Sequence, residues 1–329
     1  MDQQTKTVVI DNTIATTWYS ITPGLEDVVL KKIPYFEKLS ESGNMRKEIP
    51  DGTHWEDSVK YDKMNQNSKW FGEGASFGRS EKETKTRLIW YPRNFGTSLV
   101  RKWDRERKNR GHAQIIDYAA NIVDETISSM RDDLANDSMN QNSSGVSMHA
   151  LETLISTTPT TGSIGGLTRS TNEYLQNEAI DFSGLSTGAS LLDEMQRAVN
   201  LVNRWVGDSK TNLIVTTRVI YQDFERIAQS MQSIVTMQSD DKISLGFANL
   251  RYKNIDIIWD DKCPSGNMYL LNTDCLKLYI DPEYWFELTE WKTDPDTLDR
   301  YAQAVCVLQQ ACTNFRKQAV IHSITATTS

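Results

Sequence analysis

The pattern closest to a catalytic motif in this chain is the segment Gly184–Gly188, GLSTG, which fits the G-x-S-x-G form of a nucleophile elbow. In such an elbow the serine occupies a sharp turn between a buried strand and a helix, and a histidine accepts its proton. Residues 179–183 form only a weak strand pattern, and His322 is the one histidine that follows. Glycine and serine also suit a loop or a helix N-cap. The sequence favours a loop, and a serine hydrolase using Ser186 stays open as an alternative.

The remaining polar groups with reactive side chains do not combine into a site. Adjacent residues diverge on a helix or strand, so neighbouring carboxylates are expected to be solvated surface or turn residues. The three such pairs are Asp132-Asp133, Asp240-Asp241 and Asp260-Asp261. Cys306 and Cys312 are separated by five residues, without the second ligand pair that a zinc site needs. We therefore assign no catalytic, cofactor-binding or metal-binding residue.

Composition indicates a soluble globular protein of one or two domains. The chain has 329 residues, of which 38% are hydrophobic and 24% charged. No apolar run approaches the roughly 20 residues that span a bilayer, so no membrane partner is expected. The first residues, MDQQTKTVVIDNT, lack the pattern of a secretory signal. We therefore expect all four cysteines to be reduced and buried.

The charge of the chain is unevenly distributed. The net charge is −8, which argues against general nucleic-acid binding, because phosphate neutralisation needs clustered cations. Residues 46–110 contain 16 basic and 10 acidic residues, a net of +6, which leaves −14 on the remainder. This asymmetry suits copies of one chain that meet positive segment to negative surface. A solvated basic hairpin is the alternative interpretation.

The first hundred residues read as an arm followed by a long hairpin. Leu25 to Phe36 suggest a short amphipathic helix interrupted at Pro34. Two strands are then expected near 53–61 and 84–91, joined by a turn-rich tip, with Trp55, Asp57, Val59 and Tyr61 on one face. Acidic Glu56, Asp57 and Asp62 can face basic Lys82, Lys85 and Arg87 across this ribbon. A two-stranded hairpin is marginal by itself, so support from another subunit is expected.

The rest of the chain mixes helices and strands and predicts an α+β fold. The clearest helix is expected over 111–136, where Val123, Ile127, Met130 and Leu134 recur on one face. A mobile polar loop is predicted over 136–147. Further helices are predicted at 189–206 and 218–231, and strands at 213–217, within 250–259, at 268–271, 276–280, 301–308 and 315–321. Residues 263–267, CPSGN, are expected to form a tight turn between two of these strands.

Four segments in a fixed order carry a resemblance to a known family. They are 33–39 (IPYFEKL) before the strand at 55–61; 150–155 (ALETLI) followed by a Gly-rich stretch and 167–170 (LTRS); 212–217 (NLIVTT) with its helix; and 245–247 (LGF) through 266–272 (GNMYLLN). With these elements placed, the chain resembles the major capsid proteins of tailed bacteriophages, which share the Hong Kong 97 fold.

The resemblance implies a particular division of the chain. Residues 1–44 resemble the N-terminal arm and 45–100 the extended hairpin called the E-loop. Residues 101–179 correspond to the peripheral domain with its spine helix at 111–136. Residues 180–284 resemble the axial domain, and 285–329 supply return strands that complete the peripheral domain.

The resemblance also implies a structural function without catalysis. Members of the family assemble into hexamers and pentamers of an icosahedral head that encloses double-stranded DNA. The expected partners are other copies of the chain, a separate scaffolding protein, a portal, possible decoration proteins, and packaged DNA held by weak non-specific contact. The expected location is the virion, with assembly in the host bacterial cytoplasm. A minor structural protein of the virion is a second alternative, which a copy number of only a few per particle would favour.

Replacement of Ser186 tests the hydrolase alternative. If Ser186 is a nucleophile, Ser186→Ala removes a hydrolytic activity and also removes labelling by a serine-directed probe. A wild-type protein that such a probe does not label contradicts the hydrolase.

Overall fold

The computed structural model describes most of the chain, and the expected hairpin tip at 62–69 and the segment 245–249 lie outside the described residues. The described residues are 11, 12, 14–16, 18, 33–50, 53–61, 70, 72–74, 76, 83–108, 112–141, 145–185, 189–204, 210–232 and 250–325.

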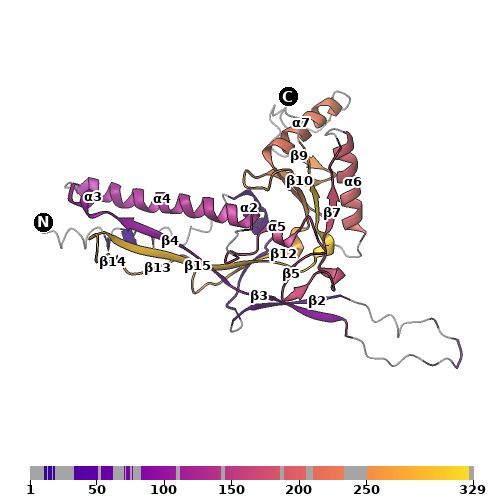
Figure 1. Ribbon diagram of the computed structural model, residues 1–329, viewed down its shortest axis with the longest axis horizontal. Coiled ribbons are helices and arrows are strands. Elements are labelled where there is room, and N and C mark those ends of the chain that lie inside the picture. The colour runs from indigo at the N-terminus through magenta and orange to yellow at the C-terminus, as the bar shows by residue number, and fades with distance from the viewer. Residues whose placement is uncertain are drawn as a thin grey trace, which may run out of the picture.

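The first of two large sheets is built around one long strand, β15 (Arg300–Cys312). The second half of β15 pairs with β12 (Leu276–Ile280), and β1 (Met45–Lys47) lies parallel to β12. Residues 300–308 of β15 pair with every residue of β4 (Arg93–Arg101). Two short strands, β13 (Glu287–Leu288) and β14 (Lys292–Thr293), also pair with β15. Figure 1 shows the resulting elongated ribbon beneath a long helix.

The second sheet stands beside the first and brings together strands that are distant in the sequence. Its six strands, in spatial order, are β7 (Glu178–Asp181), β16 (Ala319–His322), β11 (Met268–Leu271), β8 (Leu213–Thr216), β10 (Ile255–Trp259) and β9 (Leu250–Tyr252). Lys253 and Asn254 both have positive φ values, as a two-residue type I′ turn between β9 and β10 requires.

A two-stranded hairpin leaves the body at the junction of the sheets (Figure 1). It consists of β2 (Trp55–Lys60) and β3 (Lys85–Trp90), which confirms both predicted strands. A small ribbon, β5 (Ser163–Ile164) and β6 (Leu167–Thr168), supports its base, where the Ile89 amide donates to the Gly165 carbonyl at 3.1 Å. A Cβ atom at Gly165 would lie 2.9 Å from the Leu88 side chain, and its φ is +58°, so only glycine fits this contact.

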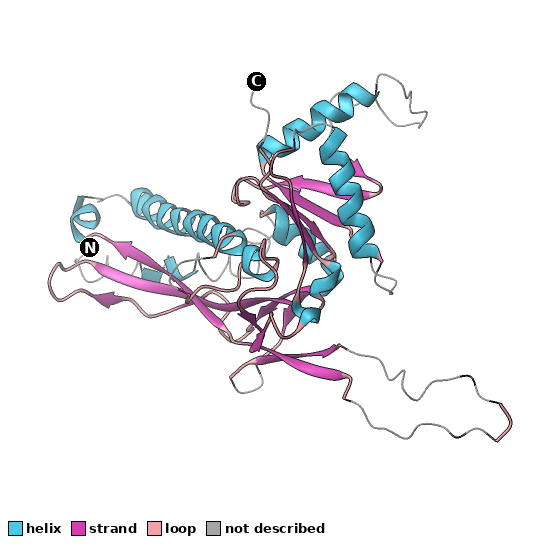
Figure 2. Ribbon diagram, turned by 45° about the vertical axis from the view of Figure 1, so that its right-hand side comes forward, coloured by secondary structure: helices cyan, strands magenta, loops and turns pink. Residues whose placement is uncertain are grey.

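Six helices complete the described architecture, and Figure 2 shows how they cover the sheets. The bounds are α2 (Pro34–Glu41), α3 (Trp103–Lys108), α4 (His112–Met139), α5 (Leu151–Leu154), α6 (Ala189–Asn203) and α7 (Arg218–Gln232). α4 packs on β4, α6 packs on β7 and β16, and α7 packs on β10. The 28 residues of α4 span about 42 Å. Three 3₁₀ turns lie at Glu173–Leu175, Thr273–Cys275 and Phe315–Lys317.

The central strands of the second sheet, β8 and β11, are buried on both faces, because two hydrophobic cores meet across them. Leu213 and Val215 of β8 belong to the core that contains α4 and the first sheet. Ile214 between them belongs to the core beneath α6 and α7. A strand covered on both faces reads as a continuous apolar run, which explains the sequence of β8 and of β11.

Three expected boundaries were wrong. α2 begins at Pro34 instead of being interrupted there, because proline suits the first turn, where its missing N–H is not needed. α4 continues to Met139, into the stretch expected to be a mobile loop, because Ser138 and Met139 are buried against the body. β15 extends to Cys312 since β12 pairs with its last five residues, and the next strand begins only at Ala319.

A buried carboxylate joins the hairpin to the first sheet. Asp57 accepts hydrogen bonds from Trp90 Nε1 at 3.0 Å, from the Tyr279 hydroxyl at 2.9 Å and from Lys277 Nζ. Trp55, on the same face of β2, stacks on the Tyr279 ring with centroids 5.3 Å apart. Burial, with Asp57 as the next cause, raises the pKa of Tyr279, so its hydroxyl stays protonated as a donor. These contacts fix the direction in which the hairpin leaves the body.

We expect Asp57→Ala to lower the free energy of unfolding by about 2–4 kcal/mol, because the buried Trp90 and Tyr279 donors lose their acceptor and the partly exposed Lys277 loses its counter-ion. Lys277 and two further donors lose their acceptor in this variant. Urea denaturation measures the change. The control is Glu56→Gln on the opposite, solvent-facing side of β2, for which no measurable change is expected. Equal stability of Asp57→Ala and wild type would contradict this role.

Candidate functional site: the projecting hairpin and its base

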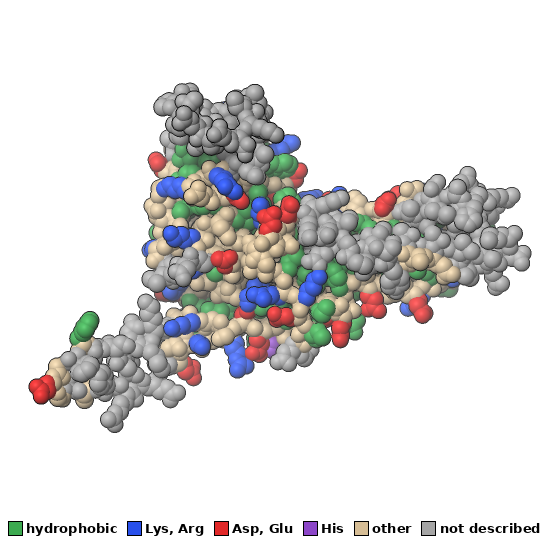
Figure 3. Space-filling model, turned by 180° about the vertical axis from the view of Figure 1, so that it is seen from behind, with side chains coloured by type: hydrophobic (Ala, Val, Ile, Leu, Met, Phe, Trp, Pro, Cys, Tyr) green, Lys and Arg blue, Asp and Glu red, His purple; other side chains and the backbone are tan. Residues whose placement is uncertain are grey.

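The outward face of the hairpin carries basic side chains, some of them without acidic partners. Arg87 donates to Glu56 at 3.1 Å, which confirms part of the expected charge pairing. Asp57 faces inward instead, and Asp62 and Lys82 lie outside the described residues. Lys60 and Lys85 oppose each other directly in the β2–β3 register and pair with no described carboxylate. Figure 3 shows Lys and Arg side chains gathered where the hairpin joins the body.

Apolar side chains are also exposed along the hairpin and at its base. Trp70 is fully exposed in the segment beyond the paired strands. Tyr91 and Ile49 are more than half exposed at the base, and the Tyr91 ring lies 6.1 Å from that of His54. Tryptophan and tyrosine are the residues that most often anchor protein interfaces. The hairpin therefore presents cations and aromatic rings together.

His149 supports the base of the hairpin from inside the body. Its ring meets the Trp90 ring edge-on, with centroids 5.9 Å apart. Its backbone amide donates to Gln309 Oε1 at 2.8 Å, while Gln309 Nε2 donates to the Tyr91 carbonyl at 2.9 Å. Burial, followed by the nearby Arg93 and Arg169, lowers the pKa of His149 to about 4. His149 is therefore neutral at pH 7 in the folded protein, a role that no sequence pattern indicated.

The described positions of the N-terminal arm contact the same subunit. Asp11 accepts from Arg101 and from Arg300, which are cross-strand neighbours in β4 and β15. Trp18 is buried and donates through Nε1 to the Phe286 carbonyl at 3.1 Å. Arg101 is buried and lies 5.3 Å from the Trp291 ring. The expected helix between Leu25 and Lys32 lies outside the described residues.

The G-x-S-x-G segment follows a real strand, contrary to the weak pattern before it. β7 ends at Asp181, α6 begins at Ala189, and Ser186 lies outside the described residues. His322 is the register partner of Asp181, and its Nδ1 lies 3.8 Å from Asp181 Oδ1. Asp181 accepts instead from the Ser183 amide and hydroxyl, both at 2.9 Å. These bonds form a surface turn.

The other chemically reactive groups are dispersed. All four cysteines are free and buried, as predicted. Asp132 and Asp133 are exposed on α4, as expected. Asp260 begins the turn that follows β10, one of the two settings expected for it, although its side chain is buried. Burial raises the pKa of the Asp260 carboxyl, and its Oδ1 accepts from the Lys262 amide at 2.9 Å. Asp240 and Asp241 lie outside the described residues.

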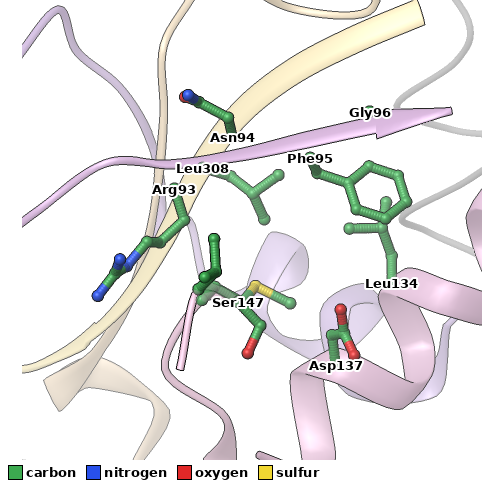
Figure 4. Close-up of a pocket in the computed structure, with 10 residues that line it drawn as sticks. Arg93, Asn94, Phe95, Gly96, Leu134, Asp137, Ser147 and Leu308 are labelled. Carbon is green, nitrogen blue, oxygen red and sulfur yellow. The ribbon is translucent and has the colours of Figure 1, made fainter. Parts of the chain in front are cut away.

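Within the part of the chain that the structure describes, no three His, Cys, Asp or Glu side chains are grouped as a metal site would need. None of the described helices is both long and apolar enough to cross a bilayer. A pocket of about 260 Å³ lies between β4 and the end of α4 (Figure 4).

No protein-family model matches this sequence, and no curated protein matches it. Solved structures do match over most of the chain. The capsid of cyanophage A-1(L) matches with a TM-score of 0.57 at 14% identity, over 85% of this chain and 89% of that one. The Hong Kong 97-like fold is thereby shown for this chain.

Other structures with the Hong Kong 97-like fold match equally well. The SrpI encapsulin of Synechococcus elongatus has a TM-score of 0.56 at 9% identity, covering 87% of this chain and 86% of its own. The capsid of a native GTA particle has a TM-score of 0.56 at 12% identity, covering 87% and 90%. The matched chains are shell proteins, not enzymes. Both the predicted α+β class and the predicted fold are confirmed.

The lowered pKa of His149 predicts a pH-dependent stability. Its folded pKa of about 4 lies below the ordinary histidine pKa of about 6.5, so the folded state is fully stable with respect to this group above pH 6.5 and loses stability as the pH falls to 4. We expect the loss to be about 3 kcal/mol. His149→Gln should flatten the dependence between pH 6.5 and 4, measured by urea denaturation across that range. An unchanged slope in this variant would show that other groups titrate there.

Proposed function

We propose that this chain is the major capsid subunit of a tailed bacteriophage. It assembles into hexamers and pentamers of an icosahedral head around double-stranded DNA and has no catalytic role. The observation that carries the proposal is the hairpin, which projects from a Hong Kong 97-like body (Figure 2). Two strands alone are marginally stable in water, so the hairpin presents its cations and Trp70 to something outside the subunit.

In the proposed subunit, successive segments of the chain form the parts of a Hong Kong 97-like capsid protein. Residues 45–100 act as the E-loop, 101–179 as the peripheral domain with α4 as spine helix, and 180–284 as the axial domain. Residues 1–44 form the arm, whose Asp11 already holds two arginines of the first sheet. Residues 285–329 supply β15, the long strand under α4, and β16, which inserts into the second sheet.

The partners follow from a role in a shell. The main partner is the chain itself, with the basic hairpin of one copy resting on the acidic surface of a neighbour. A scaffolding protein, a portal and decoration proteins complete the head, and packaged DNA touches the wall only weakly, since the chain carries −8. The head forms in the host bacterial cytoplasm and the subunit ends in the virion.

An encapsulin-type shell is the second candidate, favoured by the match to the Synechococcus elongatus structure. The two candidates share shell assembly and differ in the contents of the particle. Particles isolated from the natural source separate them, since a phage head protects double-stranded DNA from nuclease and an encapsulin-type shell does not.

Negative-stain microscopy of the purified protein, with and without a scaffolding protein, tests shell formation. We expect capsomers or closed shells of uniform size. A protein that remains monomeric under every condition would contradict both candidates.

The Lys60–Lys85 pair allows folding and assembly to be separated. Lys85→Glu places opposite charges across the strands, which stabilises the hairpin within one subunit, but it removes a cation offered to a neighbour. We expect the free energy of unfolding of the subunit to be unchanged or higher, and the protein concentration at which assembly begins to rise by about tenfold. Light scattering against protein concentration measures the threshold. Lys85→Arg keeps the charge and is the matched control. If both variants begin to assemble at the same protein concentration, the hairpin cations do not contribute to the interface.

A further inference from the structure

A half-open pocket beneath the end of α4 has no part in the proposed shell function. It has a volume of about 260 Å³ and is bounded by β4, β15, α4 and the segment 146–148. Its lining residues are Arg93, Asn94, Phe95, Gly96, Leu134, Asp137, Val146, Ser147, Met148 and Leu308. Figure 4 shows the apolar side chains of Phe95, Leu134 and Leu308 close to the Asp137 carboxylate.

The Asp137 carboxylate is the acidic group that lines this pocket. It is partly buried, and burial raises the pKa of the Asp137 carboxyl, to which Asp133 also contributes. Among the described residues no basic side chain pairs with it, and the Asn136 amide approaches it only at 3.5 Å. Arg93 lines the same pocket, but its guanidinium extends away from Asp137 (Figure 4). A carboxylate held against apolar walls gains most from a cation that brings its own apolar stem.

The surface next to the pocket has the same sign of charge. The exposed side of α4 carries Asp124, Glu125, Asp132 and Asp133 against the single described cation Arg131. None of these four carboxylates pairs with a described basic side chain. Such a face attracts a positively charged segment at long range before close contact forms.

We propose that this pocket binds a lysine or arginine side chain from a basic segment of a second protein. The aliphatic stem lies against Phe95, Leu134 and Leu308, and the cationic head donates to Asp137. A separate protein of net positive charge is a better occupant than another copy, because its whole charge is attracted to this face, whereas another copy offers only its basic 46–110 segment and brings a net charge of −8 with it. The pocket lies within one subunit, so its occupancy does not depend on shell formation.

A labelled peptide with one lysine between leucines, added to the full-length protein, tests the site by fluorescence anisotropy. We expect saturable binding that weakens by about tenfold for the same peptide with norleucine in place of lysine. Asp137→Asn should weaken lysine-peptide binding equally and leave norleucine-peptide binding unchanged. Asp124→Asn, on the exposed part of the same helix, is the matched control and should leave both unchanged.

Three results would overturn the assignment. Equal losses in Asp137→Asn and Asp124→Asn would show diffuse attraction to the acidic helix. Equal binding of the lysine and norleucine peptides to wild type, which needs no variant, would show that the charge is not recognised. Weakened self-assembly in Asp137→Asn without any peptide binding would assign the pocket to a contact between copies. Loss of shell formation alone would contradict the proposed function and leave the pocket unaffected.

Discussion

The carboxylate of Asp57 joins the hairpin to the body, and the orientation of the projecting part of the molecule depends on it. Trp90 on the second strand and Tyr279 and Lys277 on the first sheet all donate to this one side chain. Because the bonds converge from two separate sheets, the hairpin cannot rotate without leaving buried donors unsatisfied. Anchoring at the base leaves the outward face free to meet other molecules.

The second sheet is also shared between two parts of the molecule, because its two faces belong to different hydrophobic cores. Strands that are buried on both faces, such as β8 and β11, leave no room for solvated reactive groups. The likeness to capsid and encapsulin structures, at 9–14% identity, shows that very different sequences support this architecture.

Charge is separated between two surfaces of the subunit. The hairpin presents Lys60 and Lys85, whereas the described charged side chains on the exposed face of α4 are carboxylates apart from Arg131. Figure 1 shows the hairpin and α4 extending in different directions from the junction of the sheets, so neither neutralises the other within one molecule. Unneutralised surfaces of opposite sign favour contacts with other chains, and their strength falls with added salt.

The sequence by itself determined the elements whose signal is local. Alternation placed Trp55, Asp57 and Val59 on one face of a strand, and a helical period placed Val123, Ile127, Met130 and Leu134 on one side of α4. Only the tertiary structure decided what covers those faces. Tyr279 contacts Asp57 although 222 residues separate them, Asp260 is buried although it begins a turn, and β15 continues beyond its own apolar pattern because β12 pairs with its last five residues. Periodicity reports the direction of a side chain relative to its own backbone, whereas burial and hydrogen bonding depend on segments that only folding brings near.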